Sequence, residues 1–198
     1  MGAEYRDTLT STSGRAVLDR ANATAVVYAC DFSQSAVRLM EANVAAALPS
    51  CSERCVGFVC DVASQQVDEC LAEAVATRRS SESASATAPS LRTQMDYVLL
   101  VFVLSAVCPT RASTFLRNAC APLRPGGRVL FRDYGLYDMT MLRFPDSQVI
   151  DAQQRLYARQ DGTLSRILTK EDMQRLCADA GLMLVRHFRS TGGRCCGS

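Results

Sequence analysis

The segment Ala25-Val-Val-Tyr-Ala-Cys-Asp-Phe-Ser33 decides the fold class. It opens with a near-continuous apolar run and ends in Asp31, which is followed two residues later by a serine, a common helix cap. An apolar run without polar alternation is typical of a strand that is covered on both faces, as in the parallel sheets of α/β proteins. The segment therefore predicts a buried strand over residues 25–30 and a helix that starts at Ser33.

The rest of the chain repeats this alternation of strand and helix. Further apolar runs predict strands over 55–60, 97–104 and 128–131, with a fifth candidate over 182–188. Helical spacing of apolar residues predicts helices over 33–47, 111–123 and 169–180, and the last of these begins with a capping box formed by Thr169 and Asp172. This order predicts an α/β domain with a largely parallel sheet. Residues 123–127, Leu-Arg-Pro-Gly-Gly, predict a helix end and a turn that leads into the fourth strand.

Composition bounds the class of protein. The chain has 198 residues, a formal net charge of +2, 48% hydrophobic residues and 21% charged residues, which is typical of a single globular domain. No apolar run is long enough to span a bilayer, and charged residues precede any apolar run, so we expect no membrane segment, no secretory signal and a cytoplasmic protein, with the nucleus as the alternative compartment. The ten cysteines form no Cys-x-x-Cys pair and there is one histidine, so we expect reduced thiols and no metal.

Acidic residues follow the first two predicted strands. In open parallel sheets, ligands bind beyond the carboxyl ends of the strands. Asp31 can accept hydrogen bonds from both hydroxyls of a ribose, and Asp61 can accept from an adenine amino group while Val62 packs on the ring. The alternative is structural, because an acidic residue after a strand often only caps the next helix. Two such residues on consecutive strands favour an adenosine ligand.

The fourth predicted strand leads into Arg132-Asp-Tyr-Gly-Leu-Tyr-Asp138. Tyrosine stacks on nucleobases and arginine binds phosphate, so this segment indicates a surface that handles a base. The alternative is a polar turn in which arginine and aspartate pair with each other. Residues 159–163, Arg-Gln-Asp-Gly-Thr, predict a tight turn. Nearby arginines, Arg155, Arg159 and Arg166, are candidate phosphate contacts, although scattered surface arginines are common.

Several of these motifs together resemble one family. They are Tyr28-Ala-Cys-Asp-Phe-Ser33, Cys60-Asp61, residues 101–107, Leu123-Arg-Pro-Gly-Gly127, Arg132 to Asp138 with the preceding Phe131, Met141-Leu-Arg-Phe144 and Tyr157-Ala-Arg-Gln-Asp-Gly-Thr163. They are similar to the S-adenosylmethionine-dependent enzymes that form 3-methylcytidine in tRNA. The Arg-Asp-Tyr-Gly-Leu-Tyr-Asp run is the most specific of them, and the resemblance extends in order from about residue 14 to about residue 188.

The resemblance implies a Rossmann-like class I methyltransferase sheet, S-adenosyl-L-methionine as cofactor and tRNA as substrate, methylated in the anticodon loop. It implies a helper protein, such as an aminoacyl-tRNA synthetase, as a further partner. The residues implied at the cofactor are Asp31, Phe32, Asp61, Val62 and Val101. Those implied at the target cytidine are Arg132, Asp133, Tyr134, Tyr137 and Asp138, with Tyr134 or Tyr137 expected to stack on the base, and Arg143 and Arg159 are expected to contact RNA.

The chain departs from the family at three places. Residues 1–13 contain neither the glycine-rich cofactor loop nor an apolar strand, residues 77–94 predict a Ser/Ala-rich inserted loop, and residues 191–198 replace the closing strand. We therefore expect a methyltransferase domain over 14–190 that lacks its first central strand and its last strand. The neighbours of the missing strand then pair directly, or residues 1–12 fill the gap, or the chain is a truncated gene model.

These departures keep a second function open. The alternative to an active enzyme is a catalytically inactive remnant that binds RNA or a partner without cofactor. A third class, a nucleotide-dependent oxidoreductase, is disfavoured because the sequence has no Gly-x-Gly-x-x-Gly fingerprint.

Overall fold

The computed structural model describes residues 25–81 and 93–186. These residues form two compact units. The first runs through Val101 and also contains Asn118–Arg132, and the second contains Phe102–Arg117 and the residues from Asp133 onward. Within the described ranges, the helices are too short or too polar to cross a bilayer.

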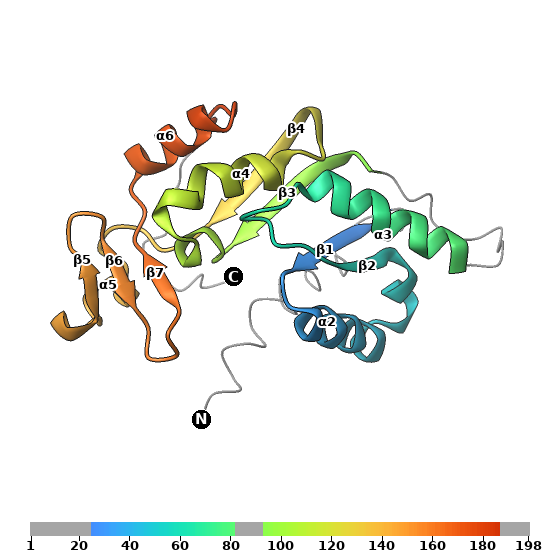
Figure 1. The fold of residues 1–198 in the computed structure, drawn as a ribbon, viewed down its shortest axis with the longest axis horizontal. Helices are drawn as coiled ribbons and strands as arrows, with labels where there is room; N and C mark the ends of the chain where they lie inside the picture. The colour runs from blue at the N-terminus through green and yellow to red at the C-terminus, as the bar shows by residue number, and fades with distance from the viewer. Residues whose placement is uncertain (1–24, 82–92, 187–198) are drawn as a thin grey trace, which may run out of the picture. The chain divides into compact units, whose positions relative to one another are not determined.

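The first unit contains a pair of parallel strands, β1 (Val27–Asp31) and β2 (Cys55–Val59), with helices on both faces (Figure 1). On one face, Met40 and Val44 of α2 (Gln34–Ala47) pack with Cys55. On the other face, residues of α3 (Val67–Ser81) pack with Val56 and Phe58. This confirms that the apolar runs at 25–30 and 55–60 are strands covered on both sides.

Helix α2 begins where the sequence predicts. The Ser33 side chain accepts a hydrogen bond from the backbone N–H of Ala36, and the buried residues Val37, Met40 and Val44 recur at helical spacing along one face. A 3-10 helix, η1 (Pro49–Arg54), then connects α2 to β2.

Side chains from both helices cover the outer edge of β2. The backbone N–H of Gly57 donates to Glu41 Oε1 of α2 at 3.1 Å, and Arg78 of α3 donates to the carbonyl of Cys55 at 3.1 Å. Arg78 also donates to the carbonyl of Glu53 at 3.2 Å. These bonds satisfy backbone groups that a neighbouring strand would otherwise pair with.

A second parallel pair in the first unit consists of β3 (Met95–Val101) and β4 (Leu123–Arg132). The strand predicted over 97–104 ends earlier, because Phe102 adopts a left-handed conformation with φ 55° and the chain then forms the 3-10 helix η2 (Leu104–Ala106). Strand β4 begins earlier than predicted. The Pro-Gly-Gly stretch is a bulge within it, with Gly126 at φ 78°, rather than a turn before it.

Among the described residues, β1 pairs with β2 and β3 pairs with β4, with no ladder between the two pairs. The expectation that the neighbours of the missing strand pair directly is therefore wrong for these residues. Residues 1–12, which are the other candidate for the gap, lie outside the described residues. One face of β3 and β4 is exposed at Tyr97, Leu99 and Leu130, so the prediction of burial on both faces is also wrong for this pair.

The second unit contains a small antiparallel sheet that the sequence pattern did not predict. Its strands are β5 (Val149–Asp151), β6 (Leu156–Ala158) and β7 (Leu164–Arg166), in that order. The predicted turn at 159–163 joins β6 to β7, with Gly162 at φ 82° and the Arg159 N–H donating to the Thr163 carbonyl at 2.8 Å.

The remaining elements of this unit are helical. They are η3 (Pro109–Arg111), α5 (Met139–Leu142), η4 (Asp146–Gln148) and α6 (Lys170–Asp179), and helix α4 (Ala112–Cys120) follows η3 and ends in the first unit. Helix α6 has the predicted capping box, in which Thr169 and Asp172 bond reciprocally.

Two further expectations are corrected. Residues 182–186 form no strand, and the remainder of that predicted strand, 187–188, lies outside the described residues. The loop predicted over 77–94 begins later, because α3 continues through Ser81 and the good helix formers Ala76, Arg78 and Arg79 lie in its last turns. Residues 82–92 of that loop, and the segments 1–13 and 191–198, lie outside the described residues.

Candidate active site

Asp31 lies at the carboxyl end of β1, where the sequence predicts a ligand contact. Its Oδ1 accepts a hydrogen bond from the Ser33 N–H at 2.8 Å, so the carboxylate orders the turn into α2. Within residues 25–81 and 93–186, Oδ2 has no hydrogen-bond partner and remains able to accept from a ligand. Phe32, the next residue, is 76% exposed. Asp31 thus fits both the structural role and the ligand role that the sequence left open.

Asp61 follows β2 and lies next to Asp31 at the carboxyl ends of the two paired strands, because the Cys60 N–H donates to the Asp31 carbonyl at 3.0 Å. The carboxylate of Asp61 accepts from the Ala63 N–H at 3.1 Å and from the Ser64 hydroxyl at 2.6 Å. These bonds order the turn that leads to α3. The adenine contact expected of Asp61 therefore competes with a local structural role.

The other two residues predicted at the cofactor also lie at strand ends of the first unit. Val62 packs against the core beside α3, and its carbonyl accepts from Asn118 Nδ2 at 3.0 Å. Val101 is the last residue of β3 and pairs with Arg132, the last residue of β4. The structure thus places Asp31 beside Asp61, and Val101 beside Arg132, at carboxyl ends of parallel strands.

Asp133 opens the predicted base-handling segment in the second unit. Its carboxylate accepts from the backbone N–H of Ser105 at 2.8 Å and from the N–H of Tyr134 at 2.9 Å. Burial raises the pKa of Asp133 above its usual value, and hydrogen bonds from Ser105 and Tyr134 and the charge of Arg159 offset only part of that effect. The half-buried carboxylate thus binds backbone N–H groups, which differs from the Arg–Asp pair of the alternative interpretation.

Tyr134 contacts an aromatic ring and a cation. Its ring centroid lies 4.9 Å from that of Phe102, and the Arg159 guanidinium stands 5.2 Å from the ring centroid. The Tyr134 carbonyl accepts from the Leu168 N–H at 3.0 Å, which ties the segment to the chain just after β7. Because Tyr134 is 8% exposed, it is a wall of the site with little surface for a stacked base.

Tyr137 presents its ring differently. It is 63% exposed and adopts a left-handed conformation with φ 63°, which is uncommon for a residue with a large side chain. Asp138 caps α5, because its carboxylate accepts from the Thr140 N–H at 2.9 Å. Arg143 is the C-cap of α5 and is exposed. After it, the Phe144 ring stacks on Tyr157 at 4.5 Å between centroids.

Two residues outside the predicted set complete this arrangement. Phe102 packs on Tyr134, and Ser105 donates to Asp133. Both follow β3 and lie within residues 101–107, which the sequence marked only as one motif of the family resemblance. The positive φ of Phe102 turns the chain there and has no sequence signature.

Comparison with known proteins identifies relatives over most of the chain. No protein-family model matches. The chain is 34% identical over 161 residues to the tRNA N(3)-cytidine methyltransferase METTL2 of Xenopus tropicalis, covering 81% of this chain and 40% of that protein. It is 37% identical over 155 residues to the tRNA N(3)-cytidine methyltransferase METTL6 of Homo sapiens, covering 78% and 45%. The chain therefore spans less than half the length of these curated relatives.

Two solved structures share the fold. A DhpI–SAM–HEP complex matches with a TM-score of 0.50 and 15% identity, covering 88% of this chain and 66% of that one. An S-adenosylmethionine-dependent methyltransferase from Clostridium acetobutylicum ATCC 824 matches with a TM-score of 0.53 and 9% identity, covering 86% and 68%. The chain is thus a homologue of the tRNA N(3)-cytidine methyltransferases, and its fold is that of the class I S-adenosylmethionine-dependent methyltransferases.

Proposed function

We propose that this chain is the greater part of a methyltransferase domain that transfers a methyl group from S-adenosylmethionine to N3 of cytidine in tRNA. The observation that carries the proposal is the identity of 34% to 37% with two tRNA N(3)-cytidine methyltransferases over about four fifths of the chain. The position of the proposed base-handling segment, Arg132 to Asp138, directly after β4 supports it further.

The strand-end carboxylates fit the cofactor. Asp31 offers Oδ2 as an acceptor at a parallel strand end, which suits the hydroxyls of a ribose, and the exposed ring of Phe32 lies beside it in sequence. Asp61, Val62 and Val101 would complete the contacts to adenine and to the methionine part. When bound, S-adenosylmethionine supplies an electrophilic methyl group.

Methylation at N3 of cytosine requires the protein to align the reacting groups and does not require acid–base catalysis. N3 of cytosine carries an in-plane lone pair at neutral pH, so the residues need to orient that lone pair and exclude water. Because N3 is buried in a Watson–Crick pair, the base must be unpaired or extruded first. We infer that the exposed ring of Tyr137 stacks on the cytosine, while Asp133 and Tyr134 form the fixed wall of the pocket.

Recognition of RNA is expected to rely on local contacts and on a partner. The formal net charge of +2 gives little bulk attraction to a polyanion. We infer that Arg143 and Arg159 supply local contacts in the anticodon loop, and that a helper protein such as an aminoacyl-tRNA synthetase contributes to tRNA selection in the cytoplasm.

Calorimetry with S-adenosylhomocysteine tests the cofactor site. The full chain is expected to bind, and Asp31→Asn is expected to weaken binding by about tenfold, because the amide keeps an acceptor for the Ser33 N–H but loses the charge. Asp96→Asn, an exposed carboxylate paired with Arg124, is the matched control and should bind like the parent chain. Absence of binding by the parent chain would contradict the cofactor assignment and favour a remnant that acts without cofactor.

A methylation assay on tRNA completes the test. The parent chain, incubated with S-adenosylmethionine and tRNA, is expected to form 3-methylcytidine, detected by mass spectrometry of the digested nucleosides. A methylated base other than 3-methylcytidine would overturn the substrate assignment, and cofactor binding without any methylated product would overturn the activity.

A further inference from the structure

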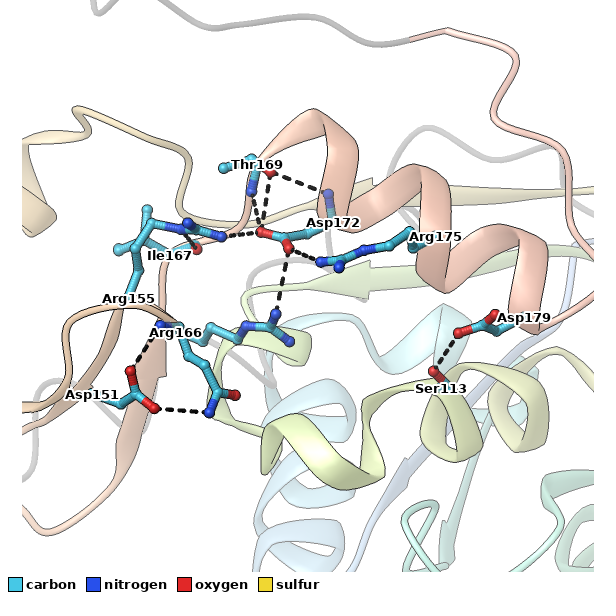
Figure 2. Close-up of polar contacts among 10 residues, drawn as sticks. Ser113, Asp151, Arg155, Arg166, Ile167, Thr169, Asp172, Arg175 and Asp179 are labelled. Carbon is cyan, nitrogen blue, oxygen red and sulfur yellow. Dashed lines mark hydrogen bonds and ion pairs between the residues drawn. The ribbon is translucent and has the colours of Figure 1, made fainter.

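A single buried carboxylate gathers three arginines in the second unit (Figure 2). Asp172 lies in the first turn of α6 and is 3% exposed. Its Oδ2 accepts from Arg155 at 2.5 Å, and its Oδ1 accepts from Arg175 at 2.5 Å and from Arg166 at 3.5 Å. The N–H and the hydroxyl of Thr169 also donate to Oδ2, at 3.0 and 3.1 Å. Both oxygens of Asp172 are therefore fully used. We refer to Arg155, Arg166, Arg175 and Asp172 as the arginine cluster.

The arginine cluster carries more positive than negative charge. Three guanidinium groups share one carboxylate, which leaves a surplus of two positive charges, and the N-terminus of α6 adds its partial positive charge. The nearest acidic neighbours along the chain, Asp151 and Glu171, form no ion pair with these arginines within residues 25–81 and 93–186. Asp151 accepts from Gln154, and Glu171 is exposed on the first turn of α6. The surplus charge is therefore not neutralised by these two side chains.

Arg166 shows the consequence of this imbalance most clearly. The residue is 9% exposed, and its Nε is buried without a hydrogen-bond partner among the described residues. Its only ion pair among those residues is the 3.5 Å contact with Asp172, which is at the limit of hydrogen-bond distance. A buried guanidinium with an unmatched donor is costly, and an additional anion would offset that cost.

The cluster is also open on one side. The Arg175 side chain is 73% exposed and that of Arg155 is 26% exposed, while Arg166 lies beneath them with 11% of its side chain exposed. Each guanidinium has five N–H donors, and the bonds to Asp172 use a minority of them. An anion that approaches beside Arg175 can therefore accept hydrogen bonds from side chains that Asp172 already holds in place.

We propose that the arginine cluster is a phosphate-binding site, in which Arg175 and Arg155 contact the anion and Arg166 adds charge from beneath. Arginine binds phosphate through two parallel hydrogen bonds, which the fixed guanidinium planes favour. The proposal rests on the proposed function in one respect, namely that the phosphate belongs to the RNA backbone. The same chemistry would also take a free phosphate ion, and the two sources are separated below.

Inorganic phosphate is the first probe. Nuclear magnetic resonance of the arginine Nε–H groups in the full chain is expected to show saturable shifts of Arg155, Arg166 and Arg175 as phosphate is added. Arg175→Gln should abolish saturation, and Arg175→Lys should restore part of it because the charge is kept. Arg124→Gln removes an exposed arginine of the first unit that is paired with Asp96, and it should leave the shifts unchanged.

Labelled RNA is the second probe, and it does not depend on methyl transfer. Fluorescence anisotropy of an RNA stem-loop is expected to show weaker binding by Arg175→Gln, with the slope of log K against log salt reduced by about 1, as expected for one lost phosphate contact. Arg124→Gln should keep the parent slope. If phosphate binds saturably but the RNA slope is unchanged, the source is a free anion and the RNA assignment is overturned.

Absence of saturable phosphate shifts and of any change in the RNA slope would overturn the proposal as a whole. The cluster would then only attach α6 to β7 and to Arg155, the residue before β6. Failure of the proposed function is distinguishable from this. The parent chain would then show no methylation or no S-adenosylhomocysteine binding, while the phosphate shifts persist. Because Arg175 is mostly exposed, its variants are expected to fold, and a thermal unfolding curve verifies this.

Discussion

The guanidinium of Arg159 stands over the ring of Tyr134, 5.2 Å from the ring centroid, at the start of the turn that joins β6 to β7. The same side chain donates to the Ser165 hydroxyl at 3.4 Å, and its charge offsets part of the burial effect that raises the pKa of Asp133. One arginine thus connects the ring, the hairpin and the half-buried carboxylate of the proposed base pocket.

Replacement of this arginine tests that connection. Arg159→Gln is expected to lower the free energy of unfolding by about 0.5–2 kcal/mol, because the cation–π contact is lost. It is also expected to raise the pKa of Asp133 further, since an opposing positive charge is removed. Urea unfolding measures the first effect, and the pH dependence of the Asp133 carboxyl resonance measures the second. An unchanged carboxyl titration would show that Arg159 does not act on Asp133.

The half-buried carboxylate of Asp133 is expected to give stability an inverse dependence on pH. Its pKa in the folded chain is raised above 3.8, so the folded state binds more protons than the unfolded state between 3.8 and the raised value. Its contribution to the free energy of unfolding therefore falls as pH rises through that window. The slope of the free energy of unfolding against pH is measured for the parent chain and for Asp133→Asn. The parent slope minus the variant slope isolates this contribution, and a positive difference would contradict it.

Asp172 is expected to act in the opposite direction. Burial raises its pKa, but hydrogen bonds from Thr169 and the charge of Arg155 outweigh burial and lower the pKa below 3.8. Its stabilisation is therefore present above pH 3.8 and is lost as pH falls through the lowered value. Asp172→Asn should lose about 3–5 kcal/mol at pH 7, because three arginines lose their counter-charge. Asp179→Asn, an exposed acid of the same helix that accepts from Ser113, should lose less than about 1 kcal/mol (Figure 2).

Gly57 is expected to tolerate no side chain. A Cβ there would lie 2.7 Å from Glu41 Oε1 and 2.8 Å from Val37 Cγ1, and Val37 is buried. Gly57→Ala should therefore lower the free energy of unfolding by about 1–3 kcal/mol. At Gly135 a Cβ would meet no atom within 4 Å, so Gly135→Ala should change stability by less than about 0.5 kcal/mol. Equal thermal unfolding curves for the two variants would show that the contact with α2 does not constrain β2.

Replacement of the two tyrosines of the proposed pocket is expected to have different effects, on stability for Tyr134 and on activity for Tyr137. Tyr134→Ala should lower the free energy of unfolding by about 3–5 kcal/mol, because the ring is buried against Phe102. Tyr137→Ala should change it by less than about 0.5 kcal/mol, because that ring is mostly exposed, yet it should abolish methylation of tRNA. Full activity of Tyr137→Ala would exclude Tyr137 as the residue that stacks on the cytosine.

Local signals in the sequence predicted much of the fold correctly. The apolar runs gave β1 and β2, the spacing of Val37, Met40 and Val44 gave α2, and the capping box gave the start of α6. The sheet of β5, β6 and β7 was missed because its strands have three residues each, which is too short for a period to be recognised. The early end of β3 was missed because a left-handed phenylalanine has no sequence signature.

The candidate site was predictable in position but not in its contacts. The strand-end rule located Asp31 and Asp61, and the composition of the segment after β4 marked Asp133 and Tyr134. Their partners come from distant parts of the chain, since Ser105 lies 28 residues before Asp133, and only tertiary structure brings such residues together. The prediction that Tyr134 or Tyr137 stacks on the base stays a prediction, and the exposure of the two rings favours Tyr137.

The bonds that Glu41 and Arg78 make to the outer edge of β2 determine the side on which a further strand can pair with this part of the sheet. An incoming strand, whether from another molecule or from elsewhere in the chain, would first have to displace two charged side chains from Gly57 and Cys55. The same bonds therefore protect a short, apolar strand against edge-to-edge aggregation. Any strand that extends the β1–β2 pair is directed to the side of β1, where it would run next to the backbone that ends in Asp31.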